Sequence, residues 1–121
     1  MDNGSGIAGT WQSTQAQWAV TDWEIKRWGT DGLSFITPAY SEQLNLKFDG
    51  KDYSDHGPRV APGSTSCAKR TDRATIEITD KLKGKVLDTQ TLKMSDDGKT
   101  LTATIHQAGV DKPMVMVFEK Q

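Results

Sequence analysis

The sequence lacks the features that define several classes of protein. Cys67 is its single cysteine, so it can form neither an intramolecular disulfide nor a cluster of thiolates on a metal. No apolar run approaches the roughly 20 residues of a membrane-spanning helix. Basic and acidic residues number 15 and 16, a balance that argues against a surface for nucleic acid or for an anionic membrane.

The length of 121 residues fits one ordinary domain and is too short for two. We expect a flexible leader over 1–6 and a single soluble domain over 7–121. The leader has no signal-peptide pattern, and we expect it to stand where a signal peptide was removed from an exported, periplasmic protein. A cytoplasmic location stays open, because a lone thiol fits that compartment too.

Apolar residues recur at every second position in the segments 44–48, 75–79 and 100–105. This period places them all on one face of a β-strand, whereas a helix would scatter them. Asp-Gly pairs at 31–32, 49–50 and 97–98 are typical of tight hairpin turns. The pattern predicts an all-β chain of short hairpins.

We expect about 8–10 antiparallel strands in an up-and-down meander, closed into a barrel that leaves no free edges. A proline-bearing stretch over 55–64 is expected to be the one longer loop. Segment 14–28 allows either a bulged strand or an amphipathic helical lid, since its apolar residues change parity. The expected strands cover 7–13, 18–28, 32–37, 42–48, 65–70, 74–80, 85–94, 99–107 and 113–120.

The motif Gly9-Thr10-Trp11, together with the segments 47–53, 75–77 and 95–102, resembles a family of small, usually exported bacterial lipocalin-like (calycin-type) proteins. The resemblance implies a meandering barrel with a lumen; it implies no known ligand and no catalytic residues. Lipocalins cover the tryptophan of this motif with an arginine of the last strand. Here no arginine occupies that strand, and Lys120 is the nearest cation.

Several residues predict the binding of a small apolar or amphipathic molecule in the lumen. Aromatic and aliphatic side chains would supply apolar walls, as in most ligand pockets. Asp88 and Gln90 share parity with apolar neighbours, so they are expected to point inward and orient the ligand, unless a bulge turns them outward. The candidate ligand-binding residues are Trp18, Trp23, Phe35, Leu46, Asp88, Gln90 and Met116.

Two other functions remain open at this point. A barrel packed solid would act as an interaction or structural protein through its 54–66 loop. An enzyme using His56, Asp55 or Cys67 would need these side chains to meet, which sequence proximity does not establish. We assign no catalytic residue, no metal ligand and no cofactor.

Overall fold

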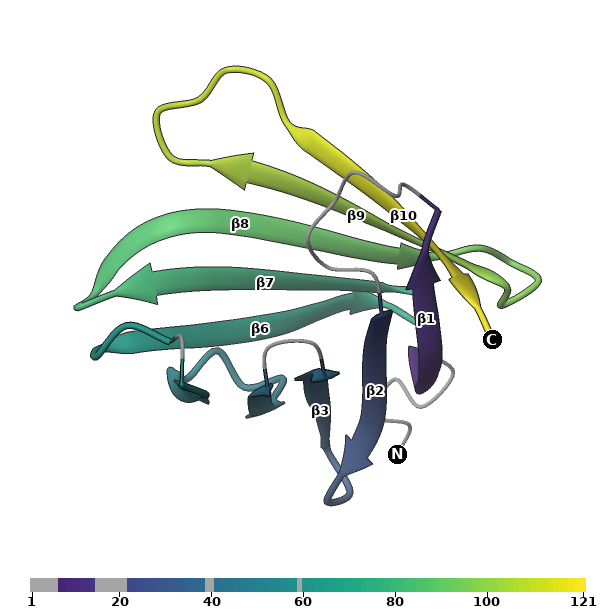
Figure 1. Cartoon of the computed structure of the whole chain (residues 1–121), viewed down its shortest axis with the longest axis horizontal. Coiled ribbons are helices and arrows are strands. Elements are labelled where there is room, and N and C mark those ends of the chain that lie inside the picture. Colours follow the sequence, from purple (N-terminus) through teal and green to yellow (C-terminus); the bar gives the residue numbers. More distant parts are fainter. Residues whose placement is uncertain (1–6, 15–21, 39–40, 59) are drawn as a thin grey trace.

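The computed structural model describes residues 7–14, 22–38, 41–58 and 60–121, which form a closed barrel of antiparallel strands (Figure 1). The expected all-β meander is confirmed. The ten strands are β1 (Gly9–Ser13), β2 (Asp22–Trp28), β3 (Gly32–Thr37), β4 (Glu42–Lys47), β5 (Tyr53–His56), β6 (Ser64–Asp72), β7 (Thr75–Leu82), β8 (Lys85–Met94), β9 (Thr100–Gln107) and β10 (Met114–Lys120).

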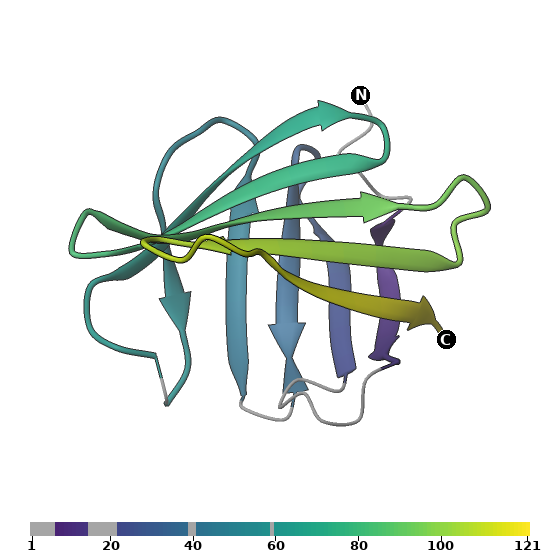
Figure 2. The ribbon, with the colours of Figure 1, turned by 90° about the horizontal axis from the view of Figure 1, so that it is seen from above.

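Each strand pairs with the next one along the chain, and β1 closes the barrel by pairing with β10. Trp11 lies at this closure, opposite Lys120 on one side and opposite Trp23 on the other. Figure 2 shows that strands of the first half of the chain cross those of the second half at a steep angle, so the barrel is flattened into two facing layers. Closure leaves every described strand with two neighbours.

The strand β5 was not expected, because 55–64 was predicted to be a loop. It pairs with β4 through Leu44 and Asp55, and with β6 through Tyr53 and Ser66. Its sequence hides the strand pattern, since an aspartate occupies an inward position where an apolar residue would reveal the alternation. The connection to β6 is therefore shorter than predicted.

The turns follow the expected chemistry only in part: Gly50 and Gly98 have positive φ, 75° and 72°, but Asp49 and Asp97 do not, so neither pair forms a two-residue primed turn. Lys83 and Gly84 both have positive φ, 51° and 83°, as a two-residue primed turn requires. Gly32 does not: it lies in β3, and a Cβ there would come within 2.5 Å of the carbonyl oxygen of Leu46. Close packing against β4, not turn geometry, explains the glycine at 32.

One end of the barrel, which we call the closed end, is filled by apolar side chains. Trp11 lies there, its indole Nε1 donates a hydrogen bond to the carbonyl of Ile7 at 2.8 Å, and Lys120 Nζ lies 5.7 Å from the centre of its ring. Lysine therefore takes the place over the tryptophan that the lipocalin resemblance gives to arginine. The closed end comprises Ile7, Trp11, Leu33, Leu46, Ile76, Leu92 and Leu101, all fully buried.

Some predictions fall on residues outside the described ranges. These are the leader 1–6 and Trp18, together with the choice between strand and lid over most of 14–21. The described remainder, Asp22–Trp28, is the strand β2, in which Trp23 and Ile25 face the core. Within the described ranges, no helix is long and apolar enough to span a membrane.

Candidate functional site: a cavity inside the barrel

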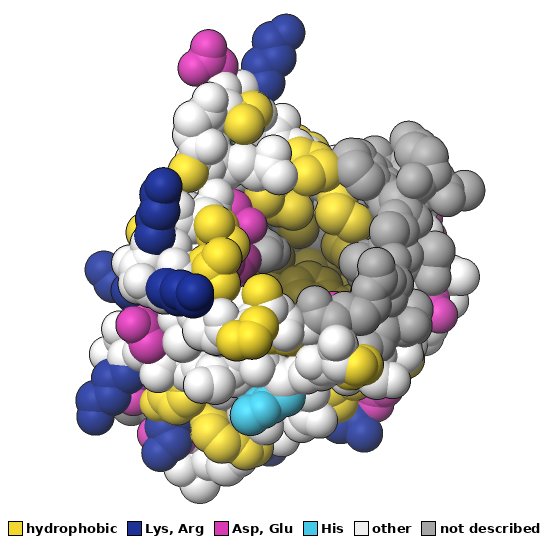
Figure 3. Space-filling model, turned by 60° about the vertical axis from the view of Figure 1, so that its left-hand side comes forward, with side chains coloured by type: hydrophobic (Ala, Val, Ile, Leu, Met, Phe, Trp, Pro, Cys, Tyr) yellow, Lys and Arg dark blue, Asp and Glu magenta, His cyan; other side chains and the backbone are white. Residues whose placement is uncertain are grey.

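Above the closed end the barrel holds a cavity of about 310 Å³. Figure 3 looks onto this side of the molecule and shows a hollow with both hydrophobic and acidic side chains in its walls. Its walls come from β2, β3, β4, β5, β6, β7 and β8. The lining residues are Trp23, Phe35, Thr37, Glu42, Gln43, Leu44, Asp55, His56, Val60, Ser66, Asp80, Asp88 and Gln90.

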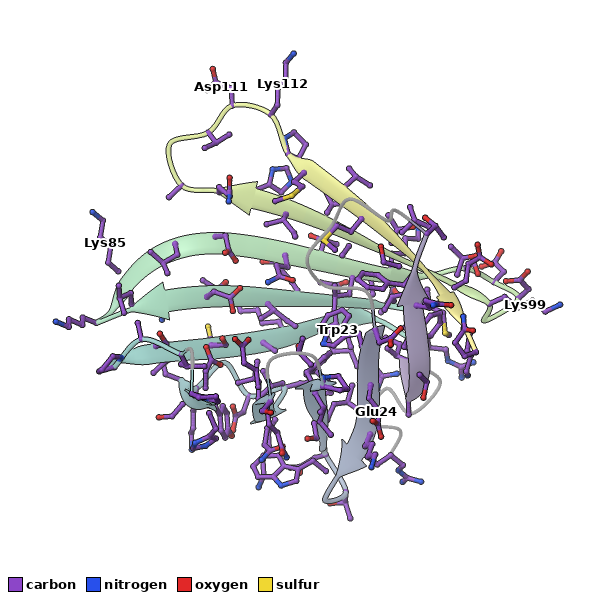
Figure 4. All side chains as sticks on the ribbon, viewed as in Figure 1. Trp23, Glu24, Lys85, Lys99, Asp111 and Lys112 are labelled. Carbon is purple, nitrogen blue, oxygen red and sulfur yellow. The ribbon has the colours of Figure 1, made fainter. Side chains whose placement is uncertain are left out.

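A second cavity of about 200 Å³ adjoins the first and shares Trp23, Thr37 and Gln90 with it. Its other walls are apolar and come from β9 and β10, with Met116 among them. Trp23 lies between β2 and the sheet of the second half of the chain (Figure 4), with its ring 5.4 Å from that of Phe35 and 5.5 Å from that of Phe118. This tryptophan therefore packs between Phe35, which lines the larger cavity, and Phe118, which lines the smaller.

The candidate ligand-binding residues are placed as follows. Trp23, Phe35 and Asp88 line the larger cavity, Met116 lines the smaller, and Gln90 lines both. Leu46 does not line either one: it is fully buried in the closed end, opposite Leu33. The reason is its position along β4, one inward step closer to the closed end than the cavity-lining Leu44.

The polar side of the larger cavity is an acidic wall, defined here as Asp55, Ser66, Asp80 and Asp88. Strand register brings these residues together, because Ser66 pairs with Asp80 and Asp80 pairs with Asp88. Asp55 joins them from β5, where it lies opposite Leu44 of β4. Four adjacent strands thus each place one oxygen-bearing side chain on the same wall.

Hydrogen bonds on the acidic wall converge on Asp80. Ser66 Oγ donates to Asp80 Oδ1 at 2.6 Å, and Gln90 Nε2 donates to Asp80 Oδ2 at 2.7 Å. Ser66 Oγ also lies 3.3 Å from Asp55 Oδ1, but a hydroxyl has one proton and the contact with Asp80 is shorter. Among the described residues, the buried Asp88 Oδ1 has no hydrogen-bond partner.

Burial and mutual repulsion disfavour ionisation on this wall. The pKa of Asp88 is raised to about 7, first by burial and then by its hydrogen bond with Asp80 and the charge of Asp80. The pKa of Asp55 is also raised, by burial and again by the charge of Asp80. No lysine or arginine lines the described part of the cavity to offset these charges.

The cysteine–histidine pair of the enzyme hypothesis does not form. Cys67 lies opposite Thr79 on β7, whereas His56 lies opposite Gln43 on β4. Since Tyr53 pairs with Ser66, the register of β5 and β6 carries His56 and Cys67 apart along the strands. His56 borders the cavity beside Asp55, without a nucleophile from Cys67.

Sequence reasoning missed most of the acidic wall. Asp80 continues the alternation of Ile76 and Ile78, so its inward direction was readable from the strand pattern. Asp55 and Ser66 gave no such signal, because neither follows an apolar run with clear parity. Only the pairing of β5 with β6 and of β6 with β7 shows that they meet Asp80.

Comparison with protein-family models and with curated protein sequences found no match.

Proposed function

We propose that the barrel binds a small amphipathic molecule in its lumen. The observation that carries this proposal is the larger cavity, whose lining combines the apolar side chains of Trp23, Phe35 and Leu44 with the acidic wall. A volume of about 310 Å³ falls within the usual size of ligand pockets, roughly 300–1,000 Å³. Apolar burial would supply most of the affinity, and the polar wall would orient the molecule.

The alternative of a barrel packed solid, acting through its surface, receives less support. Such a barrel needs side chains to fill its interior at every level, as they do at the closed end. We extend the proposal to the kind of protein that the sequence resembles, an exported bacterial lipocalin-like carrier, on the motifs at Gly9–Trp11 and 95–102.

Native mass spectrometry of the freshly purified protein is the first test. We expect an additional mass, bound in a one-to-one ratio, that leaves on denaturation and can then be extracted and identified. Protein without additional mass that also binds none of a panel of alkyl and aromatic amphiphiles would refute lumen binding.

A matched pair of variants locates the bound molecule. Thr37→Phe adds an aromatic ring at a position that lines both cavities. Val115→Phe adds a similar bulk to the exposed face of β10, where Val115 is 43% exposed. We expect the first variant to lose the bound molecule and the second to retain it. Equal retention by both would place the molecule outside the lumen.

A further inference from the structure

The acidic wall presents three carboxyl groups and a single hydroxyl. That hydroxyl, Ser66 Oγ, donates to Asp80, and so does the neighbouring Gln90 Nε2. Asp55 has only the longer, shared contact with Ser66, and the buried Asp88 Oδ1 has no partner among the described residues. A buried acceptor without a donor is costly, so a molecule that fits this wall must bring its own donors.

The charge of the wall leads to the same requirement. Asp55, Asp80 and Asp88 lie together with Glu42 at the same cavity, and no described lining residue is a lysine or an arginine. Carboxylates gathered in a partly desolvated site are stabilised by a positive charge placed among them. The aromatic rings of Trp23 and Phe35, from β2 and β3, give the cavity an apolar side.

The kind of cation is limited by geometry. Within the described ranges, no three histidine, cysteine, aspartate or glutamate side chains are arranged to hold a metal ion. An ammonium group has weaker geometric requirements than a metal ion, because it donates separate hydrogen bonds to separate oxygens without a fixed coordination shell. It also leaves the rest of the molecule free to lie against the aromatic side.

We propose that the molecule bound in the lumen is an organic amine, whose ammonium group is held by Asp55, Asp80 and Asp88 while its apolar part packs on Trp23 and Phe35. This inference rests on the lumen binding proposed above and adds the chemical class of the ligand. Asp88 supplies the unpaired oxygen, Asp80 is fixed by Ser66 and Gln90, and Asp55 closes the site from β5.

The test uses two matched pairs of probes, 2-phenylethylamine with 2-phenylethanol and octylamine with octanol, in titration calorimetry of the whole chain. Members of a pair share their apolar part and differ in charge. We expect each amine to bind at least about tenfold more tightly than its alcohol, since charge-assisted hydrogen bonds are about twice as strong as neutral ones.

Asp88→Asn removes the charge while keeping the shape, and its new amide can donate to Asp80. We expect this variant to lose the preference for amines and to keep its affinity for the alcohols. Asp111→Asn is the control: Asp111 is exposed on the loop between β9 and β10 (Figure 4), and the same change of net charge there leaves both affinities as they are.

A second readout is proton release. The pKa of Asp88 lies near 7, so bound ammonium would displace its proton, and amine affinity would rise with pH up to about 7 and then level off. Asp80 and Asp55 face Asp88 from β7 and β5, with Glu42 and His56 at the same cavity. Calorimetry in two buffers of different ionisation enthalpy measures this release, which alcohols would not cause.

The outcomes separate the two proposals. Alcohols that bind as tightly as amines, or amine binding that Asp88→Asn leaves unchanged, would overturn the ammonium site and leave lumen binding standing. Binding of neither probe type, together with a native mass free of additions, would overturn both. The melting temperature of Asp88→Asn serves as the control for its folding. At pH 8 it is expected to lie above that of wild type.

Discussion

The closed end of the barrel and the cavity above it are built by the same strands, yet they differ in what their inward positions carry. On β4, Leu46 is fully buried in the closed end, while Leu44 borders the cavity two residues earlier. On β7, Ile76 lies in the closed end and Asp80 in the acidic wall. One set of strands thus supplies both a stable core and a costly polar site.

The packed core and the polar cavity are thus separated along the strands of this barrel. Apolar inward side chains at the closed end gain free energy by burial. The carboxyl groups of the acidic wall lose hydration instead, as the raised pKa values of Asp88 and Asp55 indicate. Substitutions in the closed end are therefore expected to lower the free energy of unfolding more than substitutions beside the cavity. One substitution in the acidic wall, Asp88→Asn, is expected to raise it.

The largest effect is expected from the two paired tryptophans of β1 and β2. Trp11→Ala removes a fully buried ring and its hydrogen bond to Ile7, and should cost about 3–5 kcal/mol in the free energy of unfolding. Trp23→Ala should cost less, roughly 2 kcal/mol, because that ring already borders open volume. Urea denaturation measures both changes. Equal losses would contradict the separation of a packed closed end from a loosely packed cavity level.

The leucines of β4 give a closer comparison, with one substitution made twice on one face of one strand. Leu46→Ala should cost about 2–5 kcal/mol, since it opens a cavity in a packed region. Leu44→Ala should cost only about 1 kcal/mol, because it enlarges a cavity that already exists. A Leu44 variant as unstable as the Leu46 variant would mean that the cavity-level side chains carry the core.

Asp88→Asn is expected to stabilise the protein at high pH. The folded pKa of Asp88, about 7, lies above the ordinary value, so its ionisation favours the unfolded chain. This penalty is absent below about pH 4, grows as the pH rises towards 7 and is constant above it. The variant should gain roughly 1–2 kcal/mol at pH 8, less than the full shift implies because Asp88 is partly exposed.

Thermal unfolding of wild type and Asp88→Asn at pH 4 and pH 8 measures this effect. The two melting temperatures should coincide at pH 4 and separate at pH 8, with the variant higher. A variant that melts below wild type at pH 8 would show that ionised Asp88 contributes to the fold.

The smallest effect is expected at the β8–β9 turn, where Asp97 is exposed to solvent. Ser95 Oγ and the Lys99 N–H donate to Asp97 Oδ1 at 2.6 and 3.0 Å, and they lower the pKa of this exposed carboxyl. Asp97→Ala should lower the melting temperature slightly at pH 7. The difference should vanish as the pH falls through the lowered pKa, where the carboxyl of wild type is protonated.

Asp96→Ala, a change at the exposed neighbouring position, is the control for this turn. Differential scanning calorimetry at pH 7 and at pH 2 compares both variants with wild type. A difference at Asp97 that persists unchanged in acid would rule out the hydrogen bonds of its carboxylate as the cause.

The class of fold was predictable from the sequence, because two physical signals in it are local. Alternation at Leu44, Leu46 and Phe48 requires only the geometry of a strand, and the glycines at 50 and 98 require only the positive φ of a turn. The inward direction of Asp88 and Gln90 followed from the same alternation, and both line the cavity.

Which inward residues meet, by contrast, depends on how the whole barrel is assembled. Whether Leu46 lines a cavity or fills the closed end depends on its level in the barrel, which strand parity does not contain. The acidic wall depends on the register of β5 to β8, which pairs Ser66 with Asp80 and Asp80 with Asp88. Parity is a property of single strands, whereas register results from the closure of the whole sheet, and the candidate site is a product of register.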